Sequence, residues 1–320
     1  MYTSEYLIGY VNKAVREIRY PDEPDGLYEP IRYTLDGGGK RIRPVLTLAA
    51  CVALGGDIDV AKNQALGIEM FHNFTLLHDD VMDKADMRRG KPTVHRRWNE
   101  STAILSGDAM LTMASQLVGR CDVAKMGEVM MLFNRTAMEV YEGQQYDMDF
   151  EKRPDVSVNE YIEMIRLKTS VLLGCACEMG AIMAGGDGCE RSLFYEFGLK
   201  MGLAFQLQDD YLDTYGDPAV FGKRIGGDIL NDKKTWLLIS ALAEDDSGRL
   251  LDLVGSNIAP EDKIAGVTGI YNELNLGQRC HDIIDRYAEE AIDTVKKIGL
   301  DEDALAFFVN IVNESRCRTR

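Results

Sequence analysis

The spacing of the prolines restricts the fold of this chain more than any other feature of its sequence. Eight prolines occur in 320 residues, and none lies between Pro92 and Pro154 or between Pro154 and Pro218. A proline inside a helix removes a hydrogen bond and clashes with the preceding turn, so proline-free stretches permit long helices. Apolar residues recur at helical spacing in several of these segments. The centre of the chain therefore has room for long, uninterrupted helices.

The composition is that of a globular protein. The chain is 46% hydrophobic and 28% charged, which suits a soluble protein with a sizeable core. No run of about 18 apolar residues lacks charge, so we predict no transmembrane segment. The start shows no secretory signal. Since no long linker or low-complexity segment is apparent, we expect residues 1–320 to form a single domain.

The cysteines and the net charge narrow the class of protein further. The seven cysteines are scattered and form no CxxC pair, which favours reduced thiols in the cytoplasm over disulfides or zinc. A net charge of -16 argues against a nucleic-acid partner, because phosphate backbones attract basic surfaces. It does not exclude a phosphorylated small molecule, which local basic clusters and a divalent metal can bind.

An acidic stretch at residues 78–83 ends a predicted helix that runs from about Val60. Asp79 and Asp83 are four residues apart, so their carboxylates project from one face of that helix. His72 lies on the same face, within about 40° of them. Apolar sequence surrounds the carboxylates, and burying them is costly unless a cation lies between them. The stretch predicts a metal site, although most DDxxD strings are solvated acidic turns.

Two basic stretches flank this helix. The glycine-rich residues 36–44 could be a flexible loop, which we favour for this stretch alone, or an anion cradle that combines free backbone N–H groups with three cations, Lys40, Arg41 and Arg43. Arg88 and Arg89 directly follow the acidic helix, and their guanidinium groups can bind phosphate oxygens in pairs. Carboxylates followed closely by two arginines fit a metal-phosphate site better than a surface charge run.

The middle of the chain carries weaker signals. Residues 100–145 are rich in methionine and are expected to form one or two long helices. Residues 158–184 form an apolar helix interrupted by Arg166, Lys168 and Thr169. A lysine in such a helix usually extends its ammonium group to the surface, so Lys168 by itself indicates little.

A second acidic stretch repeats the DDxxD spacing 130 residues after the first. A polar stripe on an otherwise apolar helix results from the spacing i, i+3, i+4, i+7 of four residues, Gln206, Asp209, Asp210 and Asp213. Glycines and basic residues follow again, among them Lys223 and Lys233. Two acidic stripes, each followed by a basic loop, are an improbable coincidence.

Together these parts predict a chemistry. Two carboxylate stripes could hold magnesium ions that bridge to substrate phosphates and neutralise charge on a leaving oxygen. No serine-histidine-acid arrangement and no P-loop occurs. The apolar and aromatic surroundings indicate a diphosphate with an apolar tail that departs from carbon. A carbocation needs a site without water and with suitable dipoles, and Thr169 and Gln206 are candidates for that role.

With these motifs the chain resembles the trans-prenyltransferases, the polyprenyl diphosphate synthases that include farnesyl and geranylgeranyl diphosphate synthases. The resemblance spans Gly37 to Trp236 and rests on GGGKRIRP, HNFTLLHDDVMDKADMRRGKPTVH, LKT and FQLQDDYLDTYGDPAVFGKRIGGDILNDKKTW. It implies an all-α fold of about ten or more helices around a central apolar cavity, in a homodimer. It also implies head-to-tail condensation of isopentenyl diphosphate with an allylic diphosphate, with release of pyrophosphate and with two or three Mg²⁺ ions per active site.

The resemblance assigns roles position by position. The residues that match the isopentenyl diphosphate site are Lys40, Arg43, His72 and Arg89. Those that match contacts to the allylic diphosphate are Arg88, Lys168, Lys223 and Lys233. The matches to magnesium ligands are Asp79, Asp83 and Asp209, and the two motifs are completed by Asp80, Asp210 and Asp213. Thr169 and Gln206 match the groups near the nascent cation.

Product length is implied by the residues just before the first motif. In the family, bulk at these positions forms the floor of the cavity, and here they are Phe74 and Thr75. One bulky residue without a second indicates a medium product of fifteen to twenty carbons. A helical wheel places Phe74 about 140° from Asp79 but Thr75 only about 40° away. The periodicity therefore does not itself show that Phe74 faces the substrate tail.

Four alternatives stay open at this point. The first is a polyprenyl diphosphate synthase with a longer product. The second is an HD-type phosphohydrolase, suggested by the pair His78-Asp79, which would leave the second acidic motif and both basic loops without a purpose. Terpene cyclases share the first motif but need no isopentenyl site. A regulatory subunit typically loses one acidic motif, and this chain keeps both. No motif explains the basic end, residues 316–320.

Overall fold

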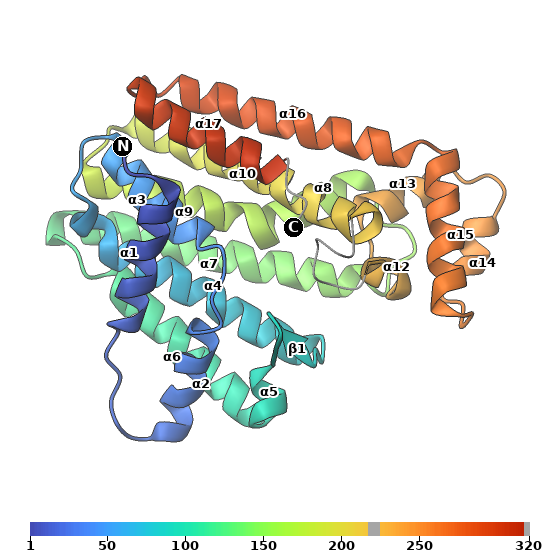
Figure 1. Ribbon diagram of the computed structural model, residues 1–320, viewed down its shortest axis with the longest axis horizontal. Coiled ribbons are helices and arrows are strands. Elements are labelled where there is room, and N and C mark those ends of the chain that lie inside the picture. Colours follow the sequence, from blue (N-terminus) through green and yellow to red (C-terminus); the bar gives the residue numbers. More distant parts are fainter. Residues whose placement is uncertain (217–224, 317–320) are drawn as a thin grey trace. The chain divides into compact units, whose positions relative to one another are not determined.

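The computed structural model in Figure 1 describes residues 1–216 and 225–316. Most of these residues are helical, and their only sheet is a short antiparallel hairpin of β1 (Met87–Arg88) and β2 (Lys91–Pro92). The prediction of an all-α fold with about ten or more helices is confirmed. Lys223 lies outside the described residues, and its role in binding the allylic diphosphate stays a prediction.

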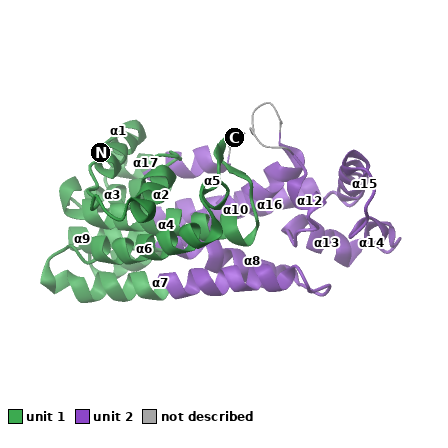
Figure 2. Cartoon of the chain, turned by 90° about the horizontal axis from the view of Figure 1, so that it is seen from below, with its two compact units in different colours: residues 1–135, 175–195, 300–307 green, residues 136–174, 196–299, 308–320 purple. Residues whose placement is uncertain are grey.

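The chain divides into two compact units, each assembled from segments far apart in sequence (Figure 2). Unit 1 comprises residues 1–135, 175–195 and 300–307, and unit 2 comprises residues 136–174, 196–299 and 308–320. Several boundaries fall inside helices, namely α7 (Val123–Phe150), α9 (Val171–Ala184), α10 (Gly188–Tyr215) and α17 (Glu302–Arg316). Cutting the chain at a linker would not separate these units. That residues 1–320 form one domain stays a prediction.

Unit 1 is organised around α4 (Lys62–Met82), which packs against α6 (Glu100–Val118) and α3 (Ile42–Ala53). A one-turn 3-10 helix (Ile58–Ala61) precedes α4. The remaining helices of the unit's first segment are α1 (Ser4–Arg16), α2 (Asp25–Leu35) and α5 (Val94–Arg97). Side-chain caps explain where α1 and α6 begin: Thr3 accepts from the N–H of Tyr6, and Asn99 from that of Thr102.

In unit 2, the second half of α7 is followed by α8 (Val158–Ile165), which Ser157 and Glu160 cap reciprocally. A π-helical turn (Arg166–Ser170) then leads into α9. Beyond α10, the described part of the chain continues with α12 (Gly227–Leu230), α13 (Trp236–Glu244), α14 (Arg249–Leu253), α15 (Pro260–Glu273), α16 (Leu276–Lys296) and α17. A cluster of buried apolar residues from α8, α10, α13, α15 and α16 forms the core of this unit.

One stretch of the chain, Val158–Ala184, has the length and composition of a membrane-crossing helix. Its most apolar window has a mean hydropathy of 1.4, but 83% of that window is buried inside the protein. Core helices pass the same test, so this finding by itself does not indicate a membrane segment.

Candidate active site

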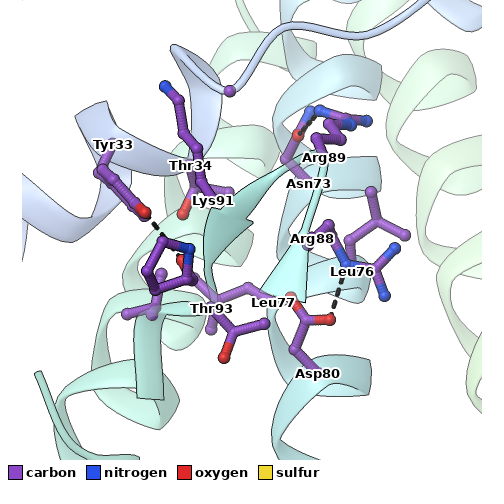
Figure 3. Close-up of a pocket in the computed structure, with 13 residues that line it drawn as sticks. Tyr33, Thr34, Asn73, Leu76, Leu77, Asp80, Arg88, Arg89, Lys91 and Thr93 are labelled. Atoms are coloured by element: carbon purple, nitrogen blue, oxygen red, sulfur yellow. Dashed lines mark hydrogen bonds and ion pairs between the residues drawn. The ribbon is translucent and has the colours of Figure 1, made fainter. Parts of the chain in front are cut away.

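In unit 1, a hollow of about 410 Å³ opens beside the end of α4 (Figure 3). Its walls come from α2, α4, the β1–β2 hairpin and the start of α5. Asp80, Arg88 and Arg89, which the sequence singled out, all line it. The hairpin thus returns the two arginines to the helix that carries the first acidic motif.

Arg88 bridges two aspartates of that motif. Its Nε donates to Oδ1 of Asp80 at 2.7 Å, and its Nη2 lies 3.5 Å from Oδ2 of Asp79. Asp80 is buried, at 5% exposed. Burial raises the pKa of its carboxyl group, and the positive charge of Arg88 opposes that rise. Asp83 caps the C-terminus of α4 and is exposed.

His72 lies among the basic residues, about two helical turns before Asp79 on α4. Its Nε2 is 3.4 Å from Nη1 of Arg43. The surrounding protein atoms, and then the charges of Arg43, Arg89 and Arg88, hold the pKa of His72 well below its ordinary value. The imidazole is therefore neutral near pH 7. Arg43 beside this ring, together with Arg88 and Arg89 in the hollow, offers guanidinium groups suited to an anion with several charges.

The structure contradicts the idea that Arg41 supplies charge to an anion cradle. Arg41 is buried, at 5% exposed, and its guanidinium group is occupied by protein. Its Nη1 donates to Oε1 of Glu69 at 2.5 Å and its Nη2 to the carbonyl of Leu35 at 2.8 Å. Because burial of a charge requires a partner, the pair with Glu69 is structural. Lys40, the preceding residue, is exposed.

Asn73 links this buried pair to Arg89. The Nδ2 of Asn73 donates to Oε1 of Glu69 at 2.9 Å, and its Oδ1 lies 3.5 Å from Nη1 of Arg89. Arg89 also donates to the carbonyl of Gly38. At Gly39, where φ is +138°, a Cβ would come within 2.9 Å of the Arg89 guanidinium. The glycine-rich loop is therefore packed against Arg89, and neither Glu69 nor Asn73 was among the predicted residues.

The two residues expected to set product length lie on different faces of α4. Phe74 is buried, and its ring centroid lies 5.5 Å from that of Phe71 and 4.8 Å from that of His78. Thr75 is half-buried and donates to the carbonyl of His72 at 2.8 Å. This agrees with the helical wheel. Whether Phe74 contacts the product stays a prediction.

In unit 2, a second hollow of about 270 Å³ is lined by residues of α7, α8, the π turn, α10 and the segment after α12. Lys168, Thr169, Gln206, Asp210 and Lys233 all line it. The sequence predicted each of them, but from separate segments. Folding therefore brings these five residues into one site.

The π turn explains how Lys168 and Thr169 reach this hollow. A π turn inserts an extra residue into a helix and is frequent at functional sites. Its neighbours leave room for it: a Cβ on Gly143 of α7 would come within 2.2 Å of the backbone nitrogen of Lys168. A Cβ on Gly202 of α10 would lie 2.6 Å from Cα of Ser170. Two glycines therefore allow neighbouring helices to approach the turn closely.

Lys168 is held by a partner that the sequence did not indicate. Its Nζ lies 2.5 Å from Oδ2 of Asp147 on α7. Although burial alone would raise it, the positive charges of Lys168 and Lys233 hold the pKa of Asp147 below its ordinary value. Asp147 is one of several acidic residues of a long helix, and no sequence motif singles it out.

The second acidic motif lies along α10. Asp209 and Asp213 are half-buried and one turn apart, whereas Asp210 is buried, at 5% exposed. Oδ2 of Asp213 accepts the N–H of Asp228 at 2.8 Å. Burial, and then the negative charge of Asp228, raises the pKa of Asp210 to about 7 and that of Asp213 to about 6. Lys233 is the nearby cation, with its Nζ 3.9 Å from Oδ1 of Asp228.

Within the described residues, no group of three or more acidic, cysteine or histidine side chains is arranged to hold a metal without other ligands. Asp79 and Asp83 belong to unit 1, and Asp209 belongs to unit 2. The predicted pairing of the two motifs across one active site stays a prediction.

An all-α protein with two DDxxD motifs, each beside basic residues, has the features of an enzyme acting on prenyl diphosphates. The sequence model of the Polyprenyl synthetase family matches residues 24–271. The chain belongs to this family.

Individual relatives support the same family assignment. The chain is 40% identical over 256 residues to the geranylgeranyl pyrophosphate synthase of Geoglobus acetivorans, covering 79% of each sequence. It resembles the crystal structure of a geranylgeranyl pyrophosphate synthase with 43% identity, a TM-score of 0.96 and 99% of each chain covered. A polyprenyl synthase from Caulobacter crescentus CB15, solved with calcium and isoprenyl diphosphate, has 26% identity and a TM-score of 0.87, covering 99% and 96% of the chains. These findings confirm the predicted family and its class, the prenyltransferases.

Proposed function

We propose that this protein joins isopentenyl diphosphate head-to-tail to an allylic diphosphate, in a magnesium-dependent reaction that releases pyrophosphate. Its family supplies the reaction class. The observation from the chain itself that best supports the proposal is that Arg88 and Arg89 line one hollow beside Asp80, while Arg43 lies 3.4 Å from His72. Such a group of guanidiniums suits a diphosphate, because each can bind two oxygens.

The substrates divide between the two groups of basic residues. Isopentenyl diphosphate is assigned to Lys40, Arg43, His72 and Arg89. The allylic diphosphate is assigned to Arg88, Lys168, Lys223 and Lys233. Lys168 and Lys233 line one hollow, which supports their joint role.

The carboxylates assigned to magnesium fit that ion. Magnesium prefers oxygen ligands and is usually held by one or two carboxylates, with waters and substrate phosphates completing its shell. Asp79, Asp83 and Asp209 offer such oxygens and keep exposed surface, so two or three ions could be shared with a bound diphosphate. The Caulobacter relative, solved with calcium, supports a divalent cation here. When bound, magnesium would neutralise charge that develops on the departing diphosphate.

The residues around the second hollow would handle the carbon skeleton. Met164 and Ile165 line it with apolar surface, which disfavours water beside a carbocation. Thr169 and Gln206 present oxygen atoms in the same hollow. Their dipoles would face positive charge on the allylic carbon while the diphosphate leaves.

We assign a medium-chain product, of fifteen to twenty carbons. The relatives named as geranylgeranyl synthases favour the upper end of this range. The decisive experiment incubates purified protein with Mg²⁺, isopentenyl diphosphate and dimethylallyl, geranyl or farnesyl diphosphate, and separates the products by chromatography. Pyrophosphate release with a medium-chain prenyl product is expected. No product from any primer would contradict the proposal.

We further propose that the enzyme is a homodimer and acts in the cytoplasm. Several large apolar side chains of unit 1 are exposed, notably Val123 at 81%, Met131 at 76% and Leu105 at 60%, and exposed apolar surface is typical of protein interfaces. Light scattering should give about twice the monomer mass of 35.8 kDa. The described cysteines are free thiols, as expected in a reducing compartment.

A further inference from the structure

A chain of hydrogen bonds in unit 2 connects a buried tyrosine to the groups assigned to the nascent cation. Tyr161 on α8 donates from its hydroxyl to Oδ2 of Asp210 at 2.5 Å. Oδ1 of the same carboxylate accepts from Nε2 of Gln206 at 2.9 Å. Oε1 of Gln206 in turn accepts from the hydroxyl of Thr169 at 3.0 Å. All four side chains line the second hollow.

The direction of this chain follows from which amide atom of Gln206 meets Asp210. The nitrogen is the atom that faces the carboxylate, because Nε2 of Gln206 donates to Oδ1 of Asp210. Oε1 of Gln206 must then face Thr169. Asp210 therefore sets which atom of the amide is presented to the hollow, and Tyr161 holds Asp210 from the other side.

We propose that Tyr161 is a positioning residue that, through Asp210, fixes the amide of Gln206 with Oε1 directed at the allylic carbon. The inference rests on the proposed function. A dipole that is already oriented stabilises developing charge without the cost of reorganising in the transition state. Tyr161 is 1% exposed, and its hydroxyl donates its hydrogen bond to Asp210. Tyr161 therefore acts on the substrate through its neighbours.

A purely structural role is the competing explanation, because the ring of Tyr161 belongs to the apolar core of unit 2. Tyr161→Phe separates the two roles, since it keeps the ring and removes only the hydroxyl. Tyr10→Phe is the matched control: Tyr10 also donates its hydroxyl to an aspartate, Asp59, but on α1 and away from both hollows.

Steady-state kinetics with isopentenyl diphosphate and an allylic primer provide the first readout. Tyr161→Phe should lower kcat about 10-fold and leave KM for both diphosphates within about twofold, because the lost orientation matters most in the transition state. Tyr10→Phe should match the unaltered protein. An unchanged kcat in Tyr161→Phe would overturn the inference.

A double-mutant cycle provides the second readout, the coupling between Tyr161 and Gln206 in kcat, which a merely structural role of Tyr161 would not produce. If Tyr161 acts through Gln206, Tyr161→Phe should lower kcat by less than about twofold when Gln206 is already replaced by leucine (Gln206→Leu). Equal losses in both backgrounds would overturn the inference. Should Tyr161→Phe fail to fold, the cycle of Asp210→Asn with Gln206→Leu tests the same link, and additive losses there would also overturn it. An unaltered protein inactive with every primer would instead contradict the proposed function.

Discussion

Arg88 donates a hydrogen bond of 2.7 Å to Asp80, the middle aspartate of the first acidic motif. The middle aspartate of the second motif, Asp210, likewise accepts hydrogen bonds from protein groups, Tyr161 and Gln206. Both middle aspartates are 5% exposed, whereas Asp79 and Asp209 keep more exposed surface. In each motif the buried carboxylate thus holds a neighbouring side chain, and the assignment of the metal to the outer carboxylates stays a prediction.

Arg88→Lys should lower kcat/KM for the allylic diphosphate about 10- to 100-fold, although the charge is kept. A lysine cannot bridge Asp80 and Asp79 or bind two phosphate oxygens at once. Steady-state kinetics with a fixed isopentenyl diphosphate concentration measure this. Arg96→Lys is the control, because Arg96 also pairs with an aspartate, Asp86, at the surface. Equal losses in both variants would show that Arg88 has no special role.

Chelation of divalent metal should abolish turnover, and Asp79→Ala should weaken metal binding while the protein stays folded. Removing one of the few carboxylate ligands of a hard cation weakens its site. Paramagnetic resonance with Mn²⁺ as the probe, in the presence of pyrophosphate, measures binding independently of activity. Asp252→Ala, on the surface of α14, should bind Mn²⁺ as the unaltered protein does. Unchanged binding in Asp79→Ala would remove Asp79 from the metal site.

Arg41→Ala should affect stability and Lys40→Ala should affect substrate binding, although the two residues are adjacent. Arg41→Ala leaves Glu69 buried without its cation and should destabilise the fold by about 3–5 kcal/mol. Lys40 is exposed, so Lys40→Ala should change stability by less than about 0.5 kcal/mol and raise KM for isopentenyl diphosphate. Chemical unfolding and kinetics distinguish the two effects. A marked loss of stability in Lys40→Ala would place Lys40 in the fold instead of the substrate site.

Gly143→Ala should destabilise the protein by at least about 1–3 kcal/mol and lower activity, because the added methyl group would collide with the backbone of Lys168. Gly9→Ala is the control: it lies in α1, where a Cβ meets nothing within 4 Å. It should stabilise the protein by about 0.5–1 kcal/mol, since alanine favours helix. Thermal unfolding compares them, and equal stability of the two variants would refute the tight packing at Gly143.

Phe74→Ala should lengthen the product if Phe74 forms the floor of the cavity. It should also destabilise the protein by about 3–5 kcal/mol, because the ring packs against Phe71 and His78. Chromatography of the products tests the first effect. Phe133→Leu controls for a loosened core, since the ring of Phe133 packs against Phe71 from α7. An identical product profile in Phe74→Ala would show that another residue forms the floor.

The helices and the motifs were predictable because they depend on short-range order. The predicted helix ending at Asp83 is observed as α4, which ends at Met82 with Asp83 as its cap. Residues 158–184 are helical as expected, but the π turn within them was not predicted. It depends on close packing against Gly143 and Gly202, and helical periodicity carries no information about such neighbours.

The sequence by itself determined the types and spacing of the charged residues, and with them the family and its chemistry. Only the tertiary structure decided the task of each: Arg41 is buried against Glu69, whereas Lys40 beside it is exposed. Asp147 holds Lys168 from 21 residues away, and Tyr161 holds Asp210 from 49. Hydrogen bonds and burial depend on distances in space, and only the folded chain brings such distant residues into hydrogen-bonding contact with one another.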